Sequence, residues 1–148
     1  MSTYTQIIYQ VVFGTKNNQY ILSAPNRQKL FMYIAGILKK KNCHIYRING
    51  VENHIHILFS LHPSVSLSSI VKDIKLASNS YIKSNNLFEK FVGWQSGYGA
   101  FTYSMKDKDR LIEYIKNQEE HHRKKSFREE YVELLDEHGV TFDEEYLI

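Results

Sequence analysis

The chain has 148 residues, of which 43% are hydrophobic and 14% aromatic. This hydrophobic content is enough for one sizeable core, and the chain is too short for two independent domains. We therefore expect residues 1–148 to form one domain. Residues 1–90 carry 11 Lys and Arg against 3 Asp and Glu, and residues 91–148 carry 8 against 13. The basic first part suits a phosphate-rich partner, although solvated surface lysines explain it equally well. A lone Cys43 excludes an internal disulfide, and the sequence shows neither a signal peptide nor an apolar run long enough for a bilayer, so we expect a cytoplasmic protein without a membrane partner.

The first half of the chain alternates strand and helix patterns. Residues 4–15 are β-branched and aromatic and predict a strand. Residues 28–41 space their apolar side chains as an amphipathic helix does. Residues 43–51 and 53–61 predict two strands that meet in a hairpin turn at Asn49-Gly50. Helical spacing returns over residues 66–83.

The second half adds one strand and two helices. A glycine-punctuated segment leads into a strand near 99–104, Asp107 can cap a helix that runs to about Glu120, and a last helix ends at Gly139. This order predicts an α+β, ferredoxin-like (split βαβ) fold: a four-stranded antiparallel sheet with helices on one face and extra C-terminal helices. The fold hosts many activities and does not decide the function.

Two histidines lie one residue apart in the strand NHIHILFS. Because side chains alternate across a strand, His54 and His56 share one face with Leu58, while the neighbouring isoleucines face the helices. We expect the imidazoles on the open face of the sheet, about 7 Å apart along the strand, where both can bind one metal ion. The alternative is a pair of ordinary surface histidines.

The helix predicted after Asp107 offers two further candidates. Tyr114 and Gln118 are four residues apart and therefore share one helical face. A glutamine carbonyl oxygen can bind a hard cation, and a deprotonated tyrosine is a strong nucleophile. The alternative is that Tyr114 packs on the sheet and Gln118 is solvated.

Five segments in this order, VVFGTKN, NHIHILFS, WQSGYGAFTYS, YIKNQEEHH and FREEYVELLDEHGVTFDEEYL, resemble the single-tyrosine HUH transposases of insertion sequences, including their REP-associated relatives. The resemblance implies that His54, His56 and Gln118 hold one divalent cation, Mg²⁺ or Mn²⁺. It implies that Tyr114 cuts and rejoins single-stranded DNA at hairpin-bearing element ends through a 5′-phosphotyrosine intermediate. It also implies a homodimer, for which apolar positions left uncovered in the last helix would be a further indication: Tyr131, Leu134 and Leu135.

DNA binding is expected to use basic and aromatic side chains elsewhere. Lysines on the two predicted helices can meet phosphates, and aromatics among glycines can stack on unpaired bases: Lys39, Lys40, Lys41, Lys72, Lys75, Lys83, Trp94 and Tyr98. Core packing of Trp94 is an equally good interpretation. Two other functions stay open: a non-catalytic nucleic-acid-binding module, and an HUH phosphodiesterase or replication initiator.

Overall fold

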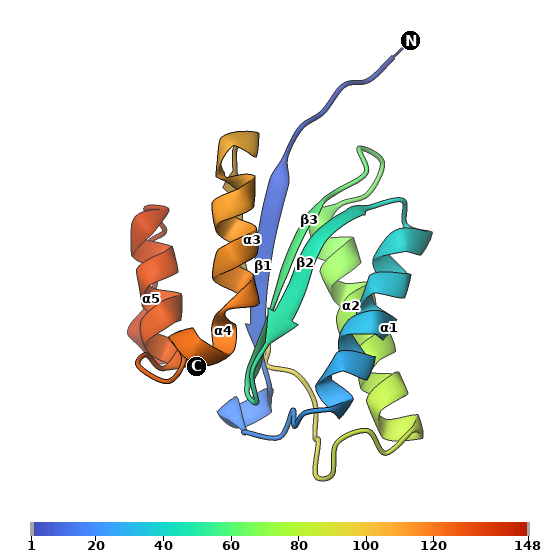
Figure 1. Cartoon of the computed structure of the whole chain (residues 1–148), viewed down its shortest axis with the longest axis vertical. Helices are drawn as coiled ribbons and strands as arrows, with labels where there is room; N and C mark the ends of the chain where they lie inside the picture. Colours follow the sequence, from blue (N-terminus) through green and yellow to red (C-terminus); the bar gives the residue numbers. More distant parts are fainter. Residues whose placement is uncertain (1, 148) are drawn as a thin grey trace.

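A four-stranded antiparallel sheet forms the centre of the computed structural model, which describes residues 2–147 (Figure 1). The strands are β1 (Ile8–Gly14), β2 (His44–Gly50), β3 (His54–Ser60) and β4 (Gly99–Tyr103), in the spatial order β2-β3-β1-β4. Chain order and strand order are those of the ferredoxin-like plan, so the fold class is confirmed.

Two long helices cover one face of the sheet. They are α1 (Asn26–Lys40) and α2 (Leu67–Ser84), which lie on the right in Figure 1. Their apolar stripes bury against the inward side chains of β1 and β3, including Phe13, Ile55 and Ile57. This cluster is the largest of the three hydrophobic clusters among the described residues, and it fixes the positions of β1 and β3.

The opposite face is covered as well, by the C-terminal helices α3 (Lys108–Lys116), α4 (Gln118–His121) and α5 (Phe127–Glu137) (Figure 1). Short 3₁₀ turns occupy Lys16–Asn18, Met105–Asp107 and Glu144–Tyr146. The expectation of an open histidine face is therefore wrong. Leu111 and Ile115 of α3 pack on Ile8 and Leu58 of that face, which shows that β3 is buried on both sides.

The last helix sits unusually close to the sheet because two glycines leave room for it. A Cβ on Gly14 would lie 2.8 Å from the Phe127 ring, and one on Gly99 would lie 2.9 Å from the Tyr131 hydroxyl. Both aromatic rings are buried there, next to Val12. Ser126 begins the helix with a capping box that it forms with Glu129.

The apolar positions expected to be uncovered are buried within the chain. Tyr131, Leu134 and Leu135 are 8%, 6% and 6% exposed, because they pack on Phe101 and Val12 of the sheet. The argument for a dimer from these three residues is therefore wrong.

Three element boundaries differ from the sequence prediction. The β2–β3 turn uses residues 51–53, while Asn49 and Gly50 stay in the ladder opposite His56 and Ile55. A Cβ at Gly50 would lie 2.3 Å from the His54 carbonyl oxygen, so this glycine serves a close backbone approach. The first strand begins at Ile8 rather than residue 4, and the helix predicted from Asp107 breaks at Asn117. Within residues 2–147, no helix has both the length and the apolar character needed to cross a membrane.

Candidate functional site

The paired histidines of β3 lie in the interior with fixed ring orientations. His54 and His56 are 0% exposed. His54 Nδ1 lies 2.8 Å from Asn53 Oδ1, and His56 Nδ1 lies 2.7 Å from Gln10 Oε1. The Gln10 amide is itself oriented, since its Nε2 donates to the Tyr103 hydroxyl (2.9 Å). Because an amide oxygen only accepts, each neutral ring carries its proton on Nδ1 and its lone pair on Nε2.

A third imidazole joins this pair from the segment after α4. His122 Nδ1 lies 2.7 Å from the backbone carbonyl of Lys125, an acceptor, so the neutral His122 ring also has its lone pair on Nε2. That Nε2 lies 3.0 Å from Gln118 Oε1. The ring stacks edge-on to His54 at a centroid distance of 4.4 Å. Three imidazole lone pairs therefore face one point beneath α5.

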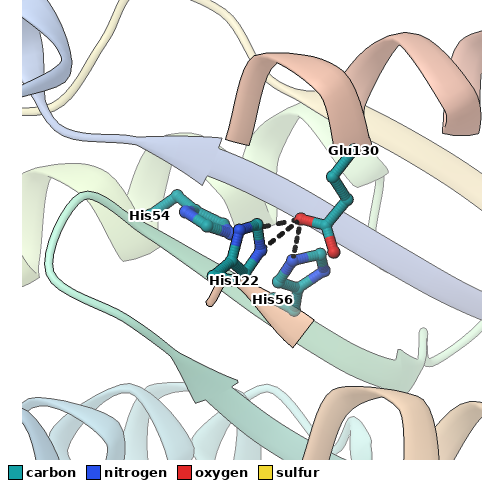
Figure 2. A group of neighbouring side chains, drawn as sticks. All are labelled: His54, His56, His122 and Glu130. Carbon is teal, nitrogen blue, oxygen red and sulfur yellow. Dashed lines mark hydrogen bonds and ion pairs between the residues drawn. The ribbon is translucent and has the colours of Figure 1, made fainter. Parts of the chain in front are cut away.

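The group opposite these lone pairs is a carboxylate. Glu130 of α5 is 1% exposed, and its Oε1 lies 2.9 Å from His56 Nε2, 3.0 Å from His122 Nε2 and 3.2 Å from His54 Nε2. Figure 2 shows these three contacts converging on a single carboxylate oxygen. Its Oε2 turns the other way and accepts from Gln118 Nε2 (3.2 Å).

This arrangement fits a bound cation. With neutral imidazoles, the atoms that meet are all acceptors, and His54 Nε2 has no hydrogen-bond partner among the described residues. Ligand atoms at about 2.0–2.2 Å from one ion and at right angles lie about 3 Å from each other, and Glu130 Oε1 lies at about this distance from each of the three Nε2 atoms. The donor atoms of His54, His56, His122 and Glu130 all lie within 4.8 Å of one another and could hold a metal ion.

The tyrosine expected as a nucleophile lies at the edge of this group. Tyr114 on α3 donates its hydroxyl proton to Glu130 Oε2, and its ring lies 6.0 Å from the His56 ring, centroid to centroid. Asn49 holds the end of α3, since its Nδ2 donates to the carbonyls of Ile115 (3.0 Å) and Lys116 (3.1 Å). The structure thus brings Tyr114, Gln118 and both predicted histidines into one site of a single chain.

The protonation states follow from burial and from Glu130. Burial lowers the pKa of His54 to about 4, which keeps this ring neutral. Burial opposes ionisation of Glu130, but His56 and contacts with His122 and His54 outweigh it, so the Glu130 pKa falls below its usual range. Burial, followed by the Glu130 charge, raises the pKa of Tyr114 above its ordinary value. A buried carboxylate beside the neutral His54 ring and a protonated phenol is an arrangement that a cation would stabilise.

Solvent barely reaches the site. Gln118, like the two strand histidines, is 0% exposed. A cavity of about 90 Å³ lies beside it between α3 and α5, with Tyr103, Arg110, Tyr114, Glu130 and Glu137 among its lining residues. A molecule larger than this cavity can therefore reach the carboxylate only if the C-terminal helices move away from the sheet.

Sequence reasoning missed three residues of the site: His121, whose Nε2 lies 3.4 Å from Glu130 Oε2, His122 and Glu130. The signal for His122 was present, because it follows Tyr114 and Gln118 at the same four-residue spacing. Glu130 was detectable as the charged residue on the face of α5 that also carries Phe127, Tyr131 and Leu134.

The lysines expected to bind DNA do not form one group. Lys39, Lys40 and Lys41 are exposed at the end of α1, where Lys41 pairs with Asp73 of α2 (3.6 Å). Lys72 is exposed on α2, and Lys83 is exposed at the end of that helix beside another hollow.

Lys75 and the two predicted aromatics have structural contacts. Lys75 donates to the carbonyls of Gln95 (3.0 Å) and Gly97, and burial lowers its pKa. Trp94 packs edge-on against Phe13 and donates to Ser78 Oγ (2.9 Å), so its partly buried ring packs against the core. Tyr98 is partly buried and lines an open apolar groove with Lys72 and Lys75.

Comparison with known proteins gives a family. Residues 3–118 match the family model described as "Transposase IS200 like". A solved structure of a candidate transposase from Deinococcus radiodurans R1 superposes with a TM-score of 0.61 at 19% identity, over 80% of this chain and 95% of that one. A REP-associated tyrosine transposase bound to a REP hairpin gives 0.57 at 18% identity, over 79% of this chain and 72% of that one. No curated protein matches the chain.

Proposed function

Because the chain belongs to the IS200-like transposases, we propose that it cleaves and rejoins single-stranded DNA at hairpin-bearing element ends, with Tyr114 as the nucleophile. We further propose that His54, His56 and Gln118 hold one divalent cation, Mg²⁺ or Mn²⁺. The observation that carries the proposal is the contact between the Tyr114 hydroxyl and the carboxylate on which the imidazoles converge.

The residues would act as follows. A divalent cation in the site supplies positive charge to the scissile phosphate. Tyr114 Oη loses its proton and attacks phosphorus in line with the leaving group; the Oη–P bond forms and the bond from phosphorus to the 3′ oxygen breaks. The net proton passes from the phenol to the 3′ oxygen. The products are a 5′-phosphotyrosine and a free 3′-OH, which can later attack that phosphotyrosine and rejoin strands without ATP.

Binding of DNA would involve surfaces outside this site. We propose that the exposed lysines of α1 and α2 contact phosphates and that Tyr98 stacks on an unpaired base, while Trp94 supports its loop from the core. A hairpin partner is supported by the REP-associated relative, which was solved with one. A cytoplasmic location and a homodimer remain predictions.

The decisive experiment uses labelled single-stranded hairpin DNA and the Tyr114→Phe protein. We expect the substitution to eliminate the covalent protein–DNA adduct and to leave hairpin binding nearly intact, because only the hydroxyl is lost. Adduct formation is read by denaturing electrophoresis, and binding by gel retardation.

Tyr131→Phe is the matched control, since this tyrosine lies on the inner face of α5 near the site and has no hydrogen bond to Glu130 among the described contacts. It should keep forming the adduct. Persistent cleavage by Tyr114→Phe would move the nucleophile to another tyrosine, with Tyr103 and Tyr131 as the first candidates. Retardation alone by the wild-type protein would indicate a binding module, and hydrolysis without an adduct would indicate a phosphodiesterase.

A further inference from the structure

Glu130 lies outside the segment that matches the family, which ends at residue 118, yet it is the centre of the site. We propose that Glu130 binds the cation through Oε1, together with His54, His56 and His122, and through Oε2 holds the hydroxyl of Tyr114, so that one carboxylate connects ion and nucleophile. This inference rests on the proposed function.

The two oxygens of Glu130 have separate partners. Oε1 faces the three imidazole nitrogens at 2.9–3.2 Å. Oε2 receives the Tyr114 hydroxyl and the Gln118 amide, and His121 Nε2 lies 3.4 Å from it. A carboxylate can bind an ion with one oxygen while the other accepts hydrogen bonds, and this division fixes the carboxylate plane.

The geometry suits coordination better than simple hydrogen bonding. One carboxylate oxygen would need a proton on each of three Nε2 atoms, but the three Nδ1 atoms already face acceptors on Asn53, Gln10 and Lys125. Every ring would then have to be protonated at both nitrogens inside the protein. Three neutral rings around one cation satisfy the same contacts with a single positive centre.

The donor set also indicates the kind of ion. Three imidazoles with one carboxylate suit Mn²⁺ or Zn²⁺, whereas Mg²⁺ prefers oxygen ligands and retains water. Gln118, proposed above as a ligand, can join this set through its oxygen, which lies 3.0 Å from His122 Nε2, while its amide nitrogen orients Glu130. We therefore expect tighter binding of Mn²⁺ than of Mg²⁺.

The main test measures Mn²⁺ binding to the full chain without DNA. By calorimetry, Glu130→Gln should weaken Mn²⁺ binding about 100-fold or more. Asp136→Asn, which removes an exposed charge from the same helix, should bind like wild type. Mn²⁺ should raise the thermal midpoint of wild type and Asp136→Asn, and not that of Glu130→Gln. Equal Mn²⁺ affinity in wild type and Glu130→Gln would overturn the proposal.

Two further measurements keep the proposal falsifiable if Glu130→Gln fails to fold. Glu130→Asp keeps the charge on a shorter side chain and should lose at least tenfold in Mn²⁺ affinity, so unchanged affinity would contradict ligation. Electron spin-echo modulation of Mn²⁺ bound to wild-type protein should report three directly coordinated imidazoles. A count of two would exclude His122.

The link to Tyr114 has its own readout. In protein labelled with 3-fluorotyrosine, the ¹⁹F resonance missing from Tyr114→Phe belongs to Tyr114. Saturating Zn²⁺ should shift this resonance in wild type and much less in Glu130→Gln; equal shifts would overturn the link. These readouts use no DNA, so a protein that binds Mn²⁺ through Glu130 but forms no adduct would contradict the proposed function alone.

Discussion

Gln118 shows how one side chain can serve a site without being its strongest ligand. It is fully buried, donates to Glu130 and lies against His122, so it connects the carboxylate with the third imidazole. Removing its amide should leave imidazoles and carboxylate in place while loosening their mutual orientation.

We therefore expect Gln118→Ala to weaken metal affinity by about tenfold and to lower the cleavage rate by more, even at saturating Mn²⁺. Calorimetric titration beside single-turnover cleavage measures both quantities. Glu120→Ala is the control, because Glu120 is exposed on the same short helix and its one ion pair with a described residue is with exposed Arg123 (3.2 Å). If saturating metal restores the full cleavage rate, Gln118 acts only as a metal ligand. If neither the metal affinity nor the cleavage rate changes, Gln118 has no role in the site.

At the scale of single residues, the sequence predicts which side chains share one face of a strand or helix better than it predicts which distant residues pack against them. Strand alternation places His54 and His56 on one face, and helical spacing places Tyr114 with Gln118, because both rules depend only on local geometry. Glu130 follows Gln118 by twelve residues and belongs to another helix, α5. The position of its carboxylate depends on how α5 packs on glycines of β1 and β4. Local rules carry no information about such long-range packing.

The element that decides access to the site is α5. It contributes Glu130, packs Phe127 and Tyr131 against the sheet, and leaves the histidines without exposure to solvent. Its docking depends on Gly99, where an added methyl group would meet the Tyr131 ring at 2.9–3.1 Å.

Gly99→Ala should consequently destabilise the protein, by about 1–3 kcal/mol, because the ring or the helix must shift. Gly36→Ala is the matched control: Gly36 lies in α1 with no atom near its would-be Cβ, so alanine should stabilise the protein by about 1 kcal/mol through helix propensity. Urea unfolding of both variants gives the two free energies. A neutral effect of Gly99→Ala would show that α5 adjusts without strain.

The buried site also predicts movement of α5 when DNA binds. With Mn²⁺ and hairpin DNA bound to Tyr114→Phe protein, amides of α5 should exchange hydrogen faster than in the free protein, whereas those of α2 should not. Mass spectrometry of peptides from both helices provides the comparison. If the wild-type protein cleaves the DNA but hydrogen exchange in α5 does not change on binding, the phosphate enters through the cavity between α3 and α5.

The two parts of the chain contribute different elements to the whole molecule. Residues 1–90 provide three of the four strands, both helices of the first face and most of the basic charge, while residues 91–148 provide Tyr114, the proposed nucleophile, and the acidic helices that cover the site. The ferredoxin-like plan could be predicted because each of its elements has its own periodicity. The coverage of the second face could not, since an amphipathic C-terminal helix can pack on its own sheet or on a partner's.

Whether the C-terminal helices pack on their own sheet or on a partner's decides which chain supplies the tyrosine to the site. Here α3 is joined to β4 by only residues 104–107, is packed on Leu58 and Ile8 of its own sheet, and has its end held by Asn49. Tyr114 accordingly meets the carboxylate of its own chain. We expect a mixture of His54→Ala/His56→Ala protein with Tyr114→Phe protein to form no adduct, because neither chain then has both histidines and nucleophile. Recovered cleavage would show that the tyrosine helix completes the site of a partner. Sedimentation of the wild-type protein with and without hairpin DNA tests the predicted homodimer separately, and a monomer that cleaves would contradict it.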